Sequence, residues 1–359
     1  MTIRPAPWLR FLVLLPLCAA SAACGSDGAA PRTFVPPINA QPGPFDSAIE
    51  RIEDGDFGRI EAVIVEQSGE IVVEEYFRKS TAQSRIDVRS VGKSITALAV
   101  GAAIEDGALP GVETRVWDYL APNDPVANGA SIKDTITVGD LLSMSSPLDC
   151  NDWVSSSPGK EEKMYRTRVW KDFALNLPAR EYQRDERGLG PFSYCTAGVF
   201  LLGQVIEKAT GERFDRFLQS RLFDPLGIDG AEYRKSRSGE FQSGGLLVIS
   251  DEALLKIGQV ILNWGEWEGR RIVSEGWVRQ AVSSSHQLGD HVHYGYLFWM
   301  MPVRSTRGYE AAIMMKGNGG NIVAIVPNMD AVLVVQAESY NKREAERNAF
   351  IALTTMLRS

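Results

Sequence analysis

The sequence is poor in histidine and cysteine, lacks long hydrophobic runs, and has no excess of basic residues. Its 359 residues include three histidines and four cysteines, and the formal net charge is −7 at neutral pH. Because there is no Lys/Arg-rich run to attract phosphate backbones, we expect no nucleic-acid partner. With 44% hydrophobic and 23% charged residues, the chain still has the composition of a globular protein with a substantial core.

The scarcity of histidine limits the kinds of catalytic triad and metal site that the chain can form. His286, His291 and His293 fall in one polar stretch, which we predict to be an exposed loop, and no Gly-x-Ser-x-Gly pattern occurs. Both observations argue against a Ser-His-Asp triad. His291 and His293 lie beside Asp290, but no further Cys or His follows at a familiar ligand spacing. We therefore expect no metal site and no cofactor.

The N-terminal segment is the one place with a nearly continuous apolar stretch, at residues 11–17, and small residues follow it. This pattern is typical of an export signal, here residues 1–23, and it is too short for a membrane span. Cys24 follows the small residues and resembles a bacterial lipoprotein site, which would provide a membrane tether; conventional cleavage after Ala22 or Ala23 is the alternative. Residues 24–45 are rich in Gly, Ala and Pro and predict a flexible tether. The prediction is a bacterial cell-envelope protein, periplasmic or membrane-anchored.

The remaining chain predicts a single domain of the α/β class, more narrowly α+β, at residues 46–359. Strand-like runs lie near both ends, at residues 59–66, 71–77, 294–300, 321–326 and 331–337. Helical patterns are found at residues 47–53, 90–105, 138–144, 197–209, 214–222 and 251–262, and again from about residue 341. We therefore expect an antiparallel sheet (about 46–108 and 286–359) flanked by terminal helices, with a mostly helical part at about 109–285.

A serine nucleophile without histidine needs another base, and the Ser-x-x-Lys pattern provides one, because residues three apart lie on one face of a helix. The pattern occurs three times. Residues 157–160 contain a Pro-Gly pair and cannot be helical. In the copy at residues 339–342, Ser339 is better explained as the N-cap of the last helix. Ser90-Val91-Gly92-Lys93 opens an apolar helix, where burial would lower the pKa of Lys93 and let it accept a proton.

From this motif onward, over about residues 57–357, the chain resembles the serine β-lactamase and penicillin-binding superfamily, especially its class C-like esterases, amidases and 6-aminohexanoate-dimer hydrolases. The family's Tyr-x-Asn motif corresponds to Tyr194-Cys195-Thr196, and its Lys/His-Thr-Gly strand motif corresponds to Asn318-Gly319-Gly320. The resemblance implies a β-lactamase/transpeptidase-like fold. It also implies an acyl-enzyme on Ser90, with Lys93 and Tyr194 transferring protons.

The same resemblance implies further site residues. The backbone N–H groups of Ser90 and Asn321 would form the oxyanion hole, and Gly319 and Gly320 would let the strand approach the substrate. Substrate contacts would come from positions 318 to 320 and from Thr196. Apart from the resemblance, Trp153 and Trp299 are candidates for pocket walls, with packing in the core as the alternative and commoner role of such aromatic residues.

Two departures from the family pattern bear on the substrate. Asn318 replaces the Lys or His that engages a substrate carboxylate, and Thr196 replaces the Asn that holds an acylamino side chain. We therefore expect a small, uncharged ester or amide as substrate. The alternatives are a β-lactamase or DD-peptidase, and a penicillin-recognising binding or sensor domain that acylates without turnover.

The cysteines provide one more expectation. Cys18 and Cys24 belong to the signal region, so only Cys150 and Cys195 remain in the folded domain. Two cysteines in an exported domain favour a disulfide bond, although two independent buried thiols are the alternative. A bond would join the loop that carries Trp153 to the residue after Tyr194.

Overall fold

The central sheet is built from strands near both ends of the chain, as predicted. The computed structural model describes residues 43–121 and 132–358. An eight-stranded antiparallel sheet runs in the order β2-β1-β13-β12-β11-β10-β9-β8. Its strands are β1 (Ile60–Gln67), β2 (Glu70–Tyr76), β8 (His286–Gly289), β9 (Val292–Tyr294), β10 (Trp299–Ser305), β11 (Gly308–Gly317), β12 (Asn321–Val326) and β13 (Ala331–Ala337).

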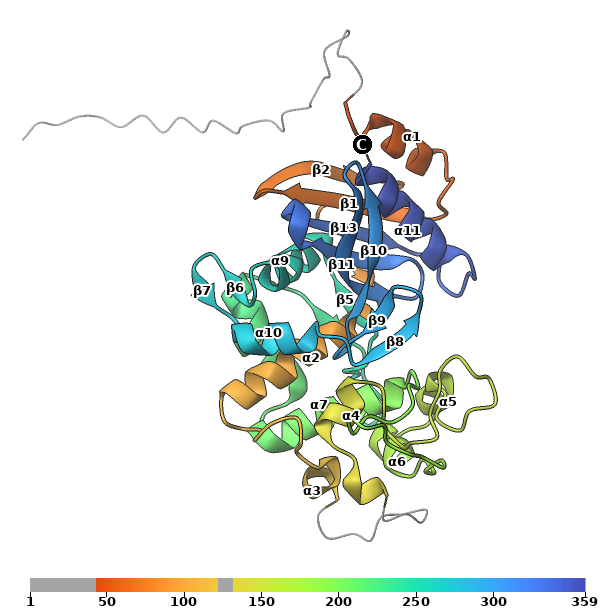
Figure 1. The fold of residues 1–359 in the computed structure, drawn as a ribbon, viewed down its shortest axis with the longest axis vertical. Coiled ribbons are helices and arrows are strands. Elements are labelled where there is room, and N and C mark those ends of the chain that lie inside the picture. The colour runs from red at the N-terminus through yellow and green to blue at the C-terminus, as the bar shows by residue number, and fades with distance from the viewer. Residues whose placement is uncertain (1–42, 122–131, 359) are drawn as a thin grey trace, which may run out of the picture. The chain divides into compact units, whose positions relative to one another are not determined.

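Helices cover both faces of this sheet (Figure 1). Helix α11 (Ala345–Met356) packs on one face together with α1 (Asp46–Glu53), while α2 (Val91–Glu105) and α9 (Asp251–Leu262) pack on the other. The alternation along β13 explains this layering, since Val332 and Val334 enter one core and Leu333 enters the other. Because both faces are covered, all seven residues of β13 are buried.

The middle of the chain is mostly helical, which confirms the predicted fold class. Its centre is α7 (Thr196–Thr210), a buried helix that contacts α2 and most of the surrounding helices. The other helices of this region are α3 (Val116–Leu120), α4 (Val138–Leu142), α5 (Glu161–Arg166), α6 (Trp170–Leu175), α8 (Phe214–Leu218), continued by a π-helix at Gln219–Phe223, and α10 (Glu275–Ala281). Figure 1 shows α3, α4, α5, α6 and α7 gathered below the sheet.

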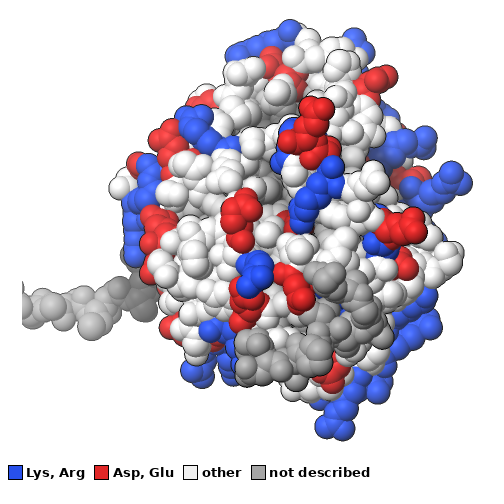
Figure 2. All heavy atoms as spheres, turned by 60° about the horizontal axis from the view of Figure 1, so that its bottom comes forward, with Lys and Arg blue, Asp and Glu red and all other residues white. Residues whose placement is uncertain are grey.

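Short strands complete the fold. Strands β3 (Ile86–Asp87), β5 (Leu247–Ile249) and β4 (Glu232–Tyr233) form a small sheet just before α2, and β6 (Glu266–Trp267) pairs with β7 (Arg270–Arg271). Helix α9, which the sequence places in the helical part, packs against β1, β12 and β13. In the described ranges, no helix combines the length and apolar character required to cross a membrane. Acidic and basic side chains are interspersed on the face shown in Figure 2.

Three sequence predictions about the C-terminal third were wrong. The run at residues 294–300 is divided between β9 and β10, and the long strand β11 was missed. The polar histidine stretch is a β-hairpin with His286 buried, because His286 packs against Phe192. The last helix begins at Ala345, and Ser339 does not cap it: its hydroxyl accepts the Arg59 N–H at 2.9 Å.

Candidate active site

The proposed nucleophile, Ser90, lies directly before α2, where three backbone segments meet. The preceding residue, Arg89, has a left-handed φ of 53°, a conformation that is costly for a side chain other than glycine and is often found at functional sites. Gly317, at the end of β11, passes so close that a Cβ atom there would lie 2.0 Å from the Val88 carbonyl oxygen and 3.3 Å from the Ser90 nitrogen. The absence of a side chain at Gly317 therefore lets the sheet reach the nucleophile.

Lys93 is placed to act on Ser90. Its Nζ lies 2.9 Å from the Ser90 Oγ and also donates a hydrogen bond to the Gly244 carbonyl oxygen. The side chain is buried, with 1% exposure. Burial lowers the pKa of Lys93, and the nearby carboxylates of Glu161 and Asp152 oppose that shift. Lys93 thus combines contact with the hydroxyl and an increased tendency to be neutral, as a general base requires.

Tyr194 is the third member of the predicted site, and it lies beside the other two. The Lys93 Nζ is 5.1 Å from the centre of the Tyr194 ring. Burial raises the pKa of the phenol far above its usual value, while interaction with the Ser90 side chain opposes that shift. The ring is stacked on Trp153, at 5.1 Å and 9°, and lies 6.2 Å from Trp299. The three residues Ser90, Lys93 and Tyr194 are therefore brought together as predicted.

A cleft of about 790 Å³ opens above these residues. Trp153 forms part of its wall and is 62% exposed, which is unusual for so large an apolar side chain. The lining includes the predicted residues Ser90, Trp153, Tyr194, Trp299, Asn318 and Gly319, together with Asp152, Glu161, Glu162, Lys316, Gly317, Asn341, Lys342, Arg343, Ala345 and Glu346. Trp153 and Trp299 thus lie where the sequence analysis placed them, on the pocket walls.

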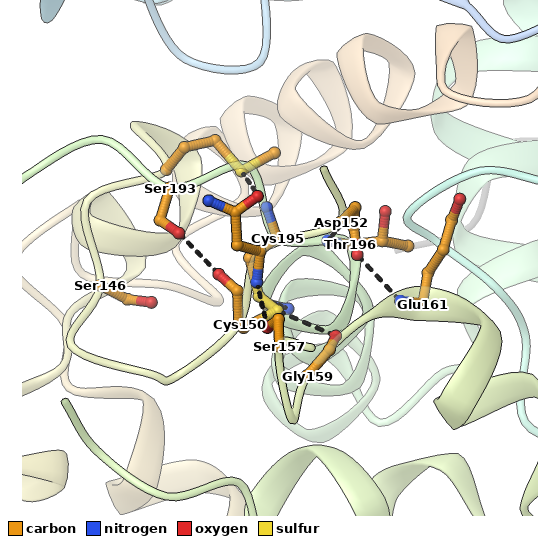
Figure 3. Close-up of a disulfide and its surroundings, with 12 residues drawn as sticks. Ser146, Cys150, Asp152, Ser157, Gly159, Glu161, Ser193, Cys195 and Thr196 are labelled. Atoms are coloured by element: carbon orange, nitrogen blue, oxygen red, sulfur yellow. Dashed lines mark hydrogen bonds between the residues drawn. A yellow bond between two sulfur atoms is a disulfide. The ribbon is translucent and has the colours of Figure 1, made fainter. Parts of the chain in front are cut away.

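The predicted disulfide bond between Cys150 and Cys195 is confirmed (Figure 3). It joins the loop that carries Trp153 to the residue that precedes α7. The Ser193 hydroxyl reinforces this connection by donating to the Cys150 carbonyl oxygen at 2.7 Å. The bond thus fixes the aromatic wall relative to Tyr194.

Asp152 adds a second connection across the cleft. Its carboxylate accepts the Thr196 N–H at 2.8 Å and the Glu161 N–H at 2.9 Å, so it joins the first turns of α7 and α5. Burial and the Glu161 carboxylate raise the pKa of Asp152 to about 6, whereas Lys93 and the Thr196 N–H lower it. Asp152 is thus both a structural link and a titratable group close to Lys93.

Several predicted site residues are not brought to the cleft. Asn321 is fully buried on β12, where its side chain donates to the carbonyl oxygens of Asn318 and Ala337. Asn321 pairs with Gly317 and therefore lies one strand further from Ser90 than Gly317 does. The structure thus does not support Asn321 as an oxyanion donor. Thr196 is also fully buried, in the first turn of α7, and does not line the cleft.

The strand motif lies differently from the prediction. Residues 318–320 form the turn between β11 and β12, and Gly319 and Gly320 adopt positive φ angles of 97° and 96° there. Gly320 lies outside the cleft lining, and the close approach to Ser90 is made by Gly317 instead. Cys24 lies outside the described residues.

The structure also reveals cleft residues that sequence reasoning missed. Asp152 gave no signal of its own, because its partner Thr196 is 44 residues away. Lys316 was read only as part of the glycine-rich run, yet it lines the cleft, 4.4 Å from the centre of the Trp299 ring and paired with Glu346. A cation is therefore present on β11, two residues before Asn318. No group of three or more potential metal ligands occurs in the part of the chain that the structure describes.

Comparison with known proteins agrees with this geometry. The chain belongs to the Beta-lactamase family, whose model matches residues 59–356. A 6-aminohexanoate-dimer hydrolase from Paenarthrobacter ureafaciens is 27% identical over 230 residues, which cover 62% of this chain and 57% of that protein. Penicillin-binding protein 4 from Amycolatopsis lactamdurans is 28% identical over 182 residues, which cover 51% of this chain and 43% of that protein. The chain thus matches about half the length of these curated relatives.

Solved structures share the fold at low sequence identity. EstCE1, described as a hydrolase with promiscuous acyltransferase activity, superposes with a TM-score of 0.68 at 16% identity, covering 87% of this chain and 96% of that one. Together with the family match, this likeness shows that the sheet and the helical part form the fold of the Beta-lactamase family.

Proposed function

We propose that this protein is a serine hydrolase that cleaves an ester or amide through an acyl-enzyme on Ser90. The observation that carries the proposal is the 2.9 Å contact between the Ser90 Oγ and the Nζ of buried Lys93. A neutral amine at this position can accept the hydroxyl proton while its remaining hydrogens keep the bond to the Gly244 carbonyl oxygen. The names of the relatives, a dimer hydrolase and a hydrolase with acyltransferase activity, support the same reaction class.

The chemical steps follow from this arrangement. The Ser90 oxygen attacks the substrate carbonyl carbon, and the hydroxyl proton passes to Lys93. The carbonyl oxygen becomes an oxyanion, which the N–H groups of Ser90 and of Asn318, the cleft residue that follows Gly317, would stabilise. Tyr194 transfers a proton to the leaving group as the bond to it breaks. Water then attacks the acyl carbon and gives a proton to Tyr194. The bond between the acyl carbon and the Ser90 oxygen breaks, Lys93 returns its proton to that oxygen, and the acid is released.

Ester or amide cleavage is tested by mass spectrometry and kinetics together. A fluorophosphonate should add one covalent label, detected by intact mass, and short-chain 4-nitrophenyl esters should be turned over many times. If the fluorophosphonate labels the protein, but the ester assay gives only a single burst of nitrophenol without turnover, the protein is instead a binding or sensor domain. Absence of any label would contradict the proposed acyl-enzyme.

We also propose that the protein acts in the bacterial cell envelope, where a periplasmic or lipid-anchored form would meet its substrate. The proposal is supported by the sequence pattern at residues 1–23, which is typical of an export signal, and by the Cys150–Cys195 bond, which suits an oxidising compartment. Substituting Cys24→Ala and measuring the membrane-bound fraction of expressed protein would test the tether. An unchanged membrane-bound fraction would contradict lipidation at Cys24.

A further inference from the structure

Beside Ser90, the cleft continues into a smaller side chamber of about 190 Å³. Arg89, the residue before the nucleophile, forms part of its wall. The chamber is lined by Arg89, Ser90, Glu161, Glu162, Tyr165, Gly244, Gly245, Leu246, Asn318 and Asn341. A group that enters the chamber can therefore contact Arg89, which is the neighbour in sequence of the nucleophile Ser90.

The guanidinium of Arg89 is held in place on two sides. It lies over the ring of Tyr340, at 4.6 Å from the ring centre, and its Nε is 3.5 Å from Asp87 Oδ2. Tyr340 is itself fixed, because its hydroxyl donates to the Asp87 carbonyl oxygen at 2.8 Å. Cation–π and charge contacts of this kind orient a guanidinium before a ligand arrives, which reduces the entropy lost on binding.

These contacts leave the hydrogen-bonding capacity of Arg89 unused. Among the described residues, none accepts a hydrogen bond from its guanidinium, and the Nε is buried without such a partner. Asp87 is shared with a second guanidinium, that of Arg234 at 3.6 Å, so one carboxylate faces two cations. Buried donors without acceptors are costly. The guanidinium, which is ion-paired with Asp87 but donates no hydrogen bond among the described residues, therefore suits an incoming acceptor that carries negative charge.

The opposite side of the chamber is acidic, and its charges are partly engaged. Glu161 accepts a hydrogen bond from the Tyr165 hydroxyl at 2.9 Å, and Glu162 lies 3.5 Å from the Lys160 ammonium. No ion pair joins either glutamate to Arg89 in the described part of the chain. The glutamates would repel an anion from α5 and thereby confine it to the Arg89 side.

We propose that Arg89 binds a free carboxylate of the substrate, which makes it a specificity-determining residue. The substrate class is then an ester or amide that carries a second, unreacted carboxylate close to the cleaved bond. A guanidinium can donate two parallel hydrogen bonds to such a group. This inference rests on the proposed hydrolysis at Ser90. It also replaces the expectation of an uncharged substrate, which considered positions 318 and 196 and did not include Arg89.

Matched ester pairs test the proposal. The first pair, mono-4-nitrophenyl adipate and 4-nitrophenyl hexanoate, differs in a carboxylate on the acyl part. The second pair, 4-carboxyphenyl hexanoate and phenyl hexanoate, differs in a carboxylate on the leaving group. We expect the wild-type kcat/KM to favour the anionic member of at least one pair. Arg89→Gln should reduce that ratio by about tenfold or more, as expected for losing a charge-assisted hydrogen bond, and Arg89→Lys should restore part of it.

The control is Arg234→Gln, which removes the other guanidinium on Asp87 without touching the chamber lining; it should leave the ratio unchanged. A purely structural role for Arg89 predicts instead that both members of a pair lose activity together, with the ratio unmoved. That result would overturn the proposal. So would a wild-type preference for the cationic 4-nitrophenyl 6-aminohexanoate, which would assign the chamber to Glu161 and Glu162.

Recognition can be separated from catalysis in the Ser90→Ala background. There, calorimetry should show tighter binding of the anionic ester than of its neutral partner, and adding Arg89→Gln should abolish the difference. Equal affinities for both esters would contradict carboxylate recognition even if Ser90 is the nucleophile. If the affinity difference is retained but the fluorophosphonate labels a residue other than Ser90 in the wild type, only the catalytic proposal is contradicted.

Discussion

The Nζ of Lys93 lies 2.9 Å from the Oγ of Ser90 inside a helix whose first three turns are buried. In this position the lysine has lost its contact with water and has one hydroxyl and one carbonyl oxygen as hydrogen-bond partners, which favours its neutral form. Burial lowers its pKa, although two nearby carboxylates act against that shift. The helix thus places a base and a nucleophile three residues apart on one face.

Removing the amine should therefore abolish most of the turnover. We expect Lys93→Ala to lower ester kcat by a factor of about 10² or more, because a proton-transfer partner is lost. Wild-type activity should rise with pH as Lys93 loses its proton, and the variant should lose that rise. Stopped-flow or steady-state assays over pH 5–9 measure both effects. Lys160→Ala, from a Ser-x-x-Lys copy that is not helical, is the control and should retain wild-type kinetics.

Asp152 should make stability depend on pH. Because burial raises its pKa to about 6 from an ordinary value of 3.8, the folded state prefers the protonated carboxyl, and the contribution to stability is lost as pH rises through about 6. Relative to Asp152→Asn, the wild type should therefore lose about 2 kcal/mol of unfolding free energy between pH 4 and pH 7.5. Urea denaturation at both pH values measures this. Glu162→Gln, an exposed carboxyl in the same cleft, is the control, and parallel curves for wild type and Asp152→Asn would disprove the effect.

The Cys150–Cys195 bond should support both stability and activity. Closing a loop of 45 residues contributes about 4 kcal/mol by chain entropy, so the double variant Cys150→Ser/Cys195→Ser should be less stable by that order. A reductant should lower ester turnover before the protein unfolds, because the Trp153 loop loses its connection to Tyr194. Peptide mapping without reduction, activity assays and circular dichroism measure these effects. Free thiols at both positions in protein produced in the periplasm would exclude the bond.

Substrate preference should favour esters over β-lactams. The end of β11 and the turn after it offer a β-lactam carboxylate no free cation, because Asn318 carries no positive charge and Lys316 is already paired with Glu346. We expect the kcat/KM for a 4-nitrophenyl ester to exceed that for nitrocefin, and Asn318→Lys to increase acylation by nitrocefin. Efficient nitrocefin hydrolysis by the wild type would contradict this expectation.

The buried parts of the fold were predictable because their sequence periodicity is strong. Helix α9 and strands β12 and β13 begin and end at the predicted residues, since α9 has an apolar face, the two strands are mostly apolar, and all three are bounded by polar or turn residues. Strands β10 and β11 were not predicted in this form. β10 contains Pro302, which is tolerated because β9 pairs only with Trp299 and Met300, and β11 is exposed in its first half and buried in its second, so neither shows a regular alternation.

The site was predictable only where its residues are close in sequence or carry a recognisable motif. Ser90 and Lys93 lie on one helix turn, and Tyr194 was identified through its motif. Asp152 and Arg89 gave no such signal, because their importance comes from contacts made by other segments: the N–H of Thr196 in one case, and the Tyr340 ring in the other. Asn321 was assigned through the family resemblance, but β11 ends at Gly317 and turns, so Asn321 lies on the next strand, β12.

The central claim is that Ser90 is the nucleophile, and one measurement tests it most directly. Wild-type protein and Ser90→Ala are treated with a fluorophosphonate, and the label is located by peptide mass spectrometry while ester turnover is measured on the same samples. We expect one label on Ser90 in the wild type, and neither label nor turnover in the variant, with unchanged circular dichroism. Labelling that persists in Ser90→Ala, or that maps to Ser157 or Ser339, would contradict the account.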